Sequence, residues 1–213
     1  MTGILFDLDG TLLDTLQDLG DGVNYALQQH GYPQRSLAEI RRFIGHGAAN
    51  LIAQSVPDGV PSGPVLDTFR PYYQAHSQVK TAPYPGIPEA LAEIRKKYPV
   101  AIVSNKPDPA VKTLCATFFG DIYALGETPG CPRKPAPDML YKARDILAVE
   151  NFLYIGDSDV DVITAHGAGA KCVSVLWGFR DEEEIRAAGG EYFCRSTAEL
   201  AQIIDQVIEE QYK

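Results

Sequence analysis

Beyond residue 88, the chain alternates between segments with helical spacing and short apolar runs, and this alternation strongly limits the fold. Strands that are apolar on both sides and joined by helices form a parallel sheet that is covered on both faces. We therefore predict an α/β fold with a doubly wound parallel sheet. The predicted strands are 100–104, 122–125, 152–155 and 172–176, with a last short strand near Tyr192.

One more strand of this sheet is expected near the N-terminus, ahead of a region that has only helical spacing. Residues 3–8 carry the apolar run "ILF" and end in a Gly-Thr turn, which indicates a buried strand. Residues 15–80 follow with helical patterns, one of which begins at a capping box formed by Ser36 and Glu39. The segment 81–88 holds three prolines and one glycine, which predicts a stiff linker. We therefore expect one α/β core domain of residues 1–14 and 82–213, interrupted by a small α-helical domain at 15–81.

The composition argues against several classes of protein. The net charge is -9 and no dense Lys/Arg run occurs, so a nucleic-acid partner is not expected. The four cysteines have no C-x-x-C spacing, which is typical of idle thiols in a reducing compartment. No apolar run is long enough to cross a membrane, and the first residues lack the basic region of a signal peptide. We expect a cytoplasmic protein without a membrane partner, as a monomer or homodimer.

Polar side chains follow four of the predicted strands at the point where each strand ends. Ligands of open parallel sheets bind beyond these carboxyl ends, so we expect the side chains to gather at one edge. They include acids, a hydroxyl, an amide and a lysine: Asp7, Asp9, Ser104, Asn105, Lys134, Asp157 and Asp161.

Such a set suits phosphoryl transfer. Clustered carboxylates without soft ligands suit a hard cation such as Mg²⁺, and Asp7 and Asp157 are the best candidate ligands. Ser104, Asn105 and Lys134 are hydrogen-bond donors, fit for phosphate oxygens. One carboxylate can attack phosphorus while a second moves the proton.

The four segments resemble, in order, the four motifs of the haloacid dehalogenase superfamily. They are "DLDGTLLDT" from Asp7, the Ser104 position, Lys134 in "RKPAP", and "GDSDVD" from Gly156. The resemblance covers essentially the whole chain and implies a Rossmann-like core with an inserted α-helical cap. It implies a phosphatase that uses Mg²⁺ and acts on a small phosphorylated metabolite.

The resemblance also implies a role for each motif residue. Asp7 would be the nucleophile and Asp9 the general acid and base. Ser104 would hold the phosphoryl group, and Lys134 would neutralise charge on it and on Asp7. Mg²⁺ would be held by three residues, with Asp161 close by or linked through water; the three are Asp7, the backbone carbonyl of Asp9, and Asp157.

Several alternatives remain open on the sequence. The presence of Asp9 favours a phosphatase or a phosphosugar mutase of the β-phosphoglucomutase kind over a dehalogenase, because relatives that cleave carbon–halogen bonds lack this acid. No lysine lies between residues 15 and 79, which argues against a phosphonate-cleaving relative with a cap lysine. A phosphate-switched receiver module has no helical cap and places its phosphoacceptor after a later strand. Asp14 is expected only to begin the helix that follows.

The substrate is the least constrained part of the prediction. The segments "IRRFIGHGAANLI", "SNKPD", "PYPG" and "VLWGF" resemble the phosphoglycolate phosphatase branch, and small-pyrophosphate hydrolases of that branch look similar. Phosphoglycolate is therefore the first expectation and pyrophosphate an alternative. In the cap, Arg42 and His46 are candidates to bind the end of the substrate that does not react.

Overall fold

The computed structural model describes residues 1–211, and the chain separates into two compact units. The first unit combines Met1–Leu13 with the chain from Pro83 onward, and the second is Asp14–Ala82. The chain passes between them through two short strands, β2 (Leu13–Asp14) and β3 (Ala82–Pro83), which pair with each other. Within the described residues, no helix is both long and apolar enough to cross a membrane.

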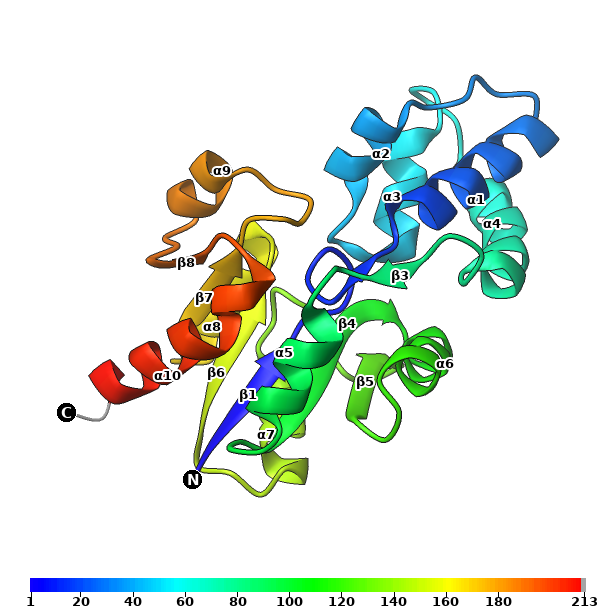
Figure 1. Ribbon diagram of the computed structural model, residues 1–213. Helices are drawn as coiled ribbons and strands as arrows, with labels where there is room; N and C mark the ends of the chain where they lie inside the picture. Colours follow the sequence, from blue (N-terminus) through cyan, green and yellow to red (C-terminus); the bar gives the residue numbers. More distant parts are fainter. Residues whose placement is uncertain (212–213) are drawn as a thin grey trace. The chain divides into compact units, whose positions relative to one another are not determined.

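The first unit is built on a six-stranded sheet in the order β5-β4-β1-β6-β7-β8 (Figure 1). Every neighbouring pair is parallel, which confirms the predicted parallel sheet. After β1 the chain builds outward on one side through β4 and β5, then returns to the other side through β6, β7 and β8. The strands are β1 (Thr2–Phe6), β4 (Val100–Pro107), β5 (Tyr123–Glu127), β6 (Asn151–Gly156), β7 (Cys172–Val175) and β8 (Tyr192–Cys194).

Helices cover both faces of this sheet, as the two-sided apolar strands predict. One apolar cluster packs the sheet against α5 (Ile87–Ile94), α6 (Asp108–Phe118) and α10 (Leu200–Gln211). A second cluster packs the opposite face against α7 (Asp138–Ile146), α8 (Asp159–Gly167) and α9 (Glu182–Ala187). A short 3₁₀ helix, Thr197–Glu199, precedes α10.

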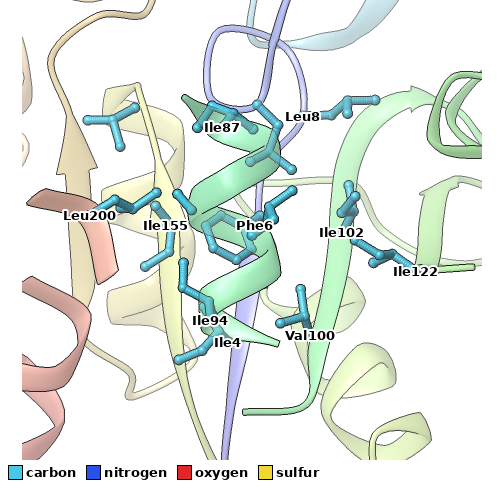
Figure 2. Packing of buried hydrophobic residues seen from close by; sticks show 14 of the residues in the cluster. Ile4, Phe6, Leu8, Ile87, Ile94, Val100, Ile102, Ile122, Ile155 and Leu200 are labelled. Carbon is cyan, nitrogen blue, oxygen red and sulfur yellow. The ribbon is translucent and has the colours of Figure 1, made fainter. Parts of the chain in front are cut away.

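The first strand is the centre of the core. Ile4, Phe6 and Leu8 belong to the first cluster, and Figure 2 shows them in line, with Ile87 and Ile94 of α5 beside them. Leu5 belongs to the second cluster, on the other face of the sheet. These four side chains are fully buried. Burial of one such side chain contributes about 1.5–3 kcal/mol to stability. This apolar anchoring fixes the position at which the strand ends and its acids begin.

One strand is longer than the sequence predicts. The apolar pattern indicates a strand that stops at residue 104, but β4 continues to Pro107, and its register against β5 shifts between Val103 and Pro107. The extra residues include Asn105 and Lys106, which are buried, as is Ser104 before them. Polar residues interrupt the apolar signal on which the strand prediction depends, so the pattern does not reveal them as part of a buried strand.

The second unit consists of four helices: α1 (Leu16–Gln29), α2 (Leu37–Phe43), α3 (Gly47–Ser55) and α4 (Gly63–His76). The predicted capping box is confirmed, since Ser36 and Glu39 exchange hydrogen bonds at the start of α2. Pro71 lies inside α4, which continues through it. Asp14 accepts a hydrogen bond from the backbone N–H of Leu16 (3.2 Å), as expected for a residue at a helix start.

Candidate active site

The topology of the first unit brings the polar strand ends together. Because β1 lies between β4 and β6, the residues that follow these three strands meet at one edge of the sheet. Asp7 follows β1, Ser104 lies in the last part of β4, and Asp157 follows β6. The backbone N–H of Asp7 donates to the carbonyl of Ile155 (2.8 Å), so the ladder between β1 and β6 extends to the first acid.

The Lys134 side chain is the centre of this edge. Its Nζ lies 2.7 Å from Oδ1 of Asp7, 2.8 Å from Oδ1 of Asp161 and 2.8 Å from the hydroxyl of Tyr154. Only 3% of the lysine side chain is exposed. Burial opposes the charged ammonium, but the carboxylates of Asp161 and Asp7 outweigh it and raise the pKa of Lys134 above its usual value. The lysine is therefore a fixed cation among buried acids.

Asn105 holds the segment that carries this lysine. Its side-chain amide donates to the backbone carbonyl of Lys134, and its carbonyl oxygen accepts from the backbone N–H of Lys134, both at 2.9 Å. Sequence reasoning predicted Asn105 as a phosphate donor. In the structure its amide bridges β4 to the loop after β5, which places the lysine, and its contact with a phosphate stays a prediction.

The carboxylates of Asp157 and Asp7 are buried near each other. Oδ1 of Asp157 accepts from the hydroxyl of Thr11 (3.2 Å), and Oδ2 accepts from the backbone N–H of Phe179 (2.7 Å). Burial, together with the nearby Asp161, raises the pKa of Asp157 to about 7 despite these bonds. Burial likewise raises the pKa of Asp7; Lys134 opposes this rise, and Asp161 and Asp157 add to it.

Asp161 differs from these two in the number of its partners, because each of its oxygens contacts at least two protein groups. Oδ1 contacts Lys134 and accepts from the hydroxyl of Tyr154 (3.1 Å). Oδ2 accepts from the hydroxyl of Ser158 (2.6 Å), its backbone N–H (3.1 Å) and the backbone N–H of Asp157 (3.2 Å). These bonds also form a capping box at the start of α8. Asp161 therefore orients its neighbours, and its lone pairs are engaged.

The acids of this edge fit a divalent cation. Asp7, Asp157 and Asp161 can each present an oxygen within 4.8 Å of the others. When all three are ionised, their charges face one buried ammonium, that of Lys134, and a hard cation would offset the excess. Since each oxygen of Asp161 already contacts two or more protein groups, Asp7 and Asp157 are the members better suited to bind the ion directly.

A second lysine, which sequence reasoning did not single out, pairs with the second acid of the first motif. Nζ of Lys106 lies 3.0 Å from Oδ1 of Asp9, and the two side chains are 5% and 14% exposed. The backbone N–H of Lys106 donates to the hydroxyl of Ser104 (3.2 Å), itself buried. The sequence feature that could have indicated a role for Lys106 is its position at a strand end, two residues after Ser104. Tyr154 was missed because a tyrosine inside an apolar strand looks like core.

The two predicted cap residues lie in the second unit. Arg42 is exposed in the last turn of α2, and His46 directly precedes α3. Their contact with a substrate stays a prediction.

Comparison with known proteins agrees with this geometry. Residues 4–175 match the family model described as haloacid dehalogenase-like hydrolase. A phosphoglycolate phosphatase of Cereibacter sphaeroides (strain ATCC 17025) is 36% identical over 190 residues, which cover 84% of this chain and 87% of the relative. A phosphoglycolate phosphatase of Aquifex aeolicus is 32% identical over 186 residues, covering 84% and 86%.

The fold is shared with solved structures over nearly its whole length. The crystal structure of a candidate phosphoglycolate phosphatase from Lactobacillus delbrueckii superposes with a TM-score of 0.90 at 33% identity. The superposition covers 95% of this chain and 98% of that one. The match of the family model, the identity to curated relatives and the shared fold lead to one conclusion: the chain belongs to the haloacid dehalogenase-like hydrolases and is a phosphatase of that family.

Proposed function

We propose that this phosphatase hydrolyses a small phosphate monoester through an aspartyl-phosphate on Asp7, with Mg²⁺ as its cofactor. The observation that carries the proposal is the position of Asp7. It is a buried carboxylate at a strand end, 2.7 Å from a fixed lysine and close to the second carboxylate of Asp157. A nucleophile in such surroundings can approach a negatively charged phosphate ester, because cationic groups offset the repulsion.

The chain's own residues then have separate tasks. An oxygen of Asp7 attacks phosphorus, the bond from phosphorus to the ester oxygen breaks, and Asp9 gives its proton to the departing alkoxide. Asp9, now ionised, accepts a proton from water as that water attacks the aspartyl-phosphate, which releases inorganic phosphate and restores Asp7. Ser104 donates to the phosphoryl group, and Lys134 balances its charge.

The metal site follows from the same arrangement. Asp7 and Asp157 would bind Mg²⁺ directly, with the backbone carbonyl of Asp9, and Asp161 would act through water or through Lys134. When bound, Mg²⁺ supplies charge neutralisation at the phosphoryl oxygens. Thr11 and the backbone N–H of Phe179 each hold one oxygen of Asp157 and so fix its orientation.

Phosphoglycolate is our proposed substrate. The support is the name shared by the relatives of Cereibacter sphaeroides and Aquifex aeolicus, at 36% and 32% identity. We assign residues 15–81 as the cap that selects the leaving group, with Arg42 and His46 toward the substrate carboxylate. The cytoplasmic location and the monomeric or homodimeric state stay predictions.

The test is a panel of phosphate compounds with Mg²⁺, ranked by kcat/KM. Phosphoglycolate should rank first among phosphoglycolate, pyrophosphate, hexose phosphates and nucleotides. Preference for pyrophosphate would identify a pyrophosphatase, and isomerisation of a hexose phosphate without phosphate release would identify a mutase.

The nucleophile is tested separately. Asp7→Asn should abolish phosphate release from every ester, because an amide is a poor nucleophile. Substantial turnover in this variant would remove Asp7 from that role.

A further inference from the structure

We propose that Lys106 is a positioning residue that acts on the reaction through Asp9. The inference rests on the proposed function, since it explains how the acid and base of that reaction is held. No motif assigns a role to this lysine, although it is buried, as Lys134 is.

The geometry of Lys106 pairs it with Asp9. Its Nζ lies 3.0 Å from Oδ1 of Asp9, and only 5% of its side chain is exposed. A buried ammonium is costly unless a carboxylate compensates it, so this pair is a fixed contact and differs from a mobile surface ion pair. Lys106 can hold this place because β4 extends two residues past Asn105 to Pro107 as its register shifts.

Two lysines thus pair with different acids of the site. Lys134 contacts Asp7 and Asp161, and Lys106 contacts Asp9. Both depend on β4, since Asn105 binds the backbone of Lys134 while Lys106 is its immediate neighbour. The strand therefore places the lysine that holds Asp9, and through it the distance from the carboxyl group of Asp9 to the leaving oxygen. Proton transfer depends on that distance, because a carboxyl group must be within hydrogen-bond reach of the leaving oxygen.

A positioning role and a direct contact with the substrate phosphate predict different kinetics. If Lys106 acts through Asp9, its loss lowers kcat and leaves KM within about twofold, because ground-state binding does not change. If it binds the phosphoryl group, its loss raises KM and acts equally whether or not Asp9 is present.

The experiment is a double-mutant cycle on the Mg²⁺-loaded enzyme. General acid and base catalysis contributes about 10²–10⁴-fold, so Asp9→Asn should lower kcat by that factor, and Lys106→Met by roughly 10–100-fold. In the Asp9→Asn background, Lys106→Met should lower kcat by less than about threefold further. The effects of substitutions at residues that act as one unit are not additive. Lys106→Gln is the second variant, because it keeps a donor at this position without the charge.

Two controls separate the possible failures. Lys97→Met removes an exposed lysine paired with Asp205 at 2.6 Å and should leave kcat and KM unchanged. Native fluorescence of Trp177, whose indole N–H donates to the carbonyl of Thr11 (3.0 Å), reports that the loop next to Asp9 is intact in each variant.

The outcomes are distinct. Equal losses from Lys106→Met with and without Asp9, or a rise in KM with unchanged kcat, would overturn the inference while the proposed function stands. Loss of native fluorescence in both Lys106 variants would also overturn it, because the lysine would then be structural. A wild-type enzyme that releases no phosphate from any ester would overturn the proposed function, and the inference with it.

Discussion

Replacement of Lys134 by methionine tests the charge balance of the site most directly. Methionine has a similar length and no charge, so the change removes the cation while filling most of its space. It deletes three contacts at once, to the carboxylates of Asp7 and Asp161 and to the hydroxyl of Tyr154. The perturbation therefore acts on charge and hydrogen bonding more than on packing.

The expected loss follows from what remains buried. Asp7 and Asp161 keep 10% and 1% side-chain exposure, and the variant leaves them and Asp157 without an ammonium. Removing one partner from a buried ion pair costs about 3–5 kcal/mol, because the other charge stays uncompensated. The exposed pair of Lys97 and Asp205 should contribute only about 0–1 kcal/mol.

The assay is urea unfolding without metal at pH 8, followed by the fluorescence of Trp177. This is the only tryptophan of the chain and lies in the first unit, so its signal reports the unfolding of the unit that contains the site. We expect Lys134→Met to lower the free energy of unfolding by about 3–5 kcal/mol, with the slope against urea unchanged.

The matched substitution Lys97→Met should lower it by less than about 1 kcal/mol. A loss for Lys134→Met as small as that of the Lys97 control would refute the reasoning. It would mean that the acids of the site are not held as buried charges.

Three further predictions concern the same acids and the second unit. The raised pKa of Asp157 (about 7) means that this group binds a proton more tightly in the folded state, so its contribution to stability falls as the pH rises from about 4 to about 7. Above that range, in EDTA, Asp157→Asn should be roughly 2–4 kcal/mol more stable than the wild type and should lose stabilisation by Mg²⁺. Gly178→Ala should weaken Mg²⁺ affinity by about 10–100-fold, because the new Cβ would lie 2.3 Å from Cβ of Asp157 and 2.4 Å from its Oδ2. Asp18→Ala should lower the thermal stability of the second unit by about 2–3 kcal/mol, since the buried carboxylate accepts the backbone N–H groups of Lys80 and Thr81.

Each of these has a separate measurement. Unfolding free energies of wild type and Asp157→Asn at pH 4 and pH 8 test the first, and a constant difference between them would contradict it. Calorimetric titration with Mg²⁺ measures the affinity of Gly178→Ala, and an affinity equal to that of the wild type would contradict the prediction. Thermal melts followed by circular dichroism test Asp18→Ala, with Asp67→Ala as an exposed control on α4; equal melting temperatures would contradict the prediction.

Much of the fold could be predicted from the sequence because its signals are local. The apolar residues of β1 and the helical spacing after each strand indicate which faces of the strands and helices are buried. Burial of those faces determines how the sheet and the helices form layers. The capping box of Ser36 and Glu39 is likewise contained in four consecutive residues. The sequence also predicts that the polar residues after the strands lie at one edge of the sheet, because parallel strands have their carboxyl ends at the same edge.

Only the tertiary structure decided which of those polar groups meet. Lys106 and Asp9 lie almost a hundred residues apart in the chain, and their ion pair depends on β4 continuing beyond its apolar part. Asn105 has the chemistry of a hydrogen-bond donor and acceptor in the sequence, and only the fold shows that its amide bonds to the backbone of Lys134. Residue type states what a side chain can donate or accept. Which partner it has depends on distances of about 3 Å between segments, and those are set only when the strands pair and the core packs.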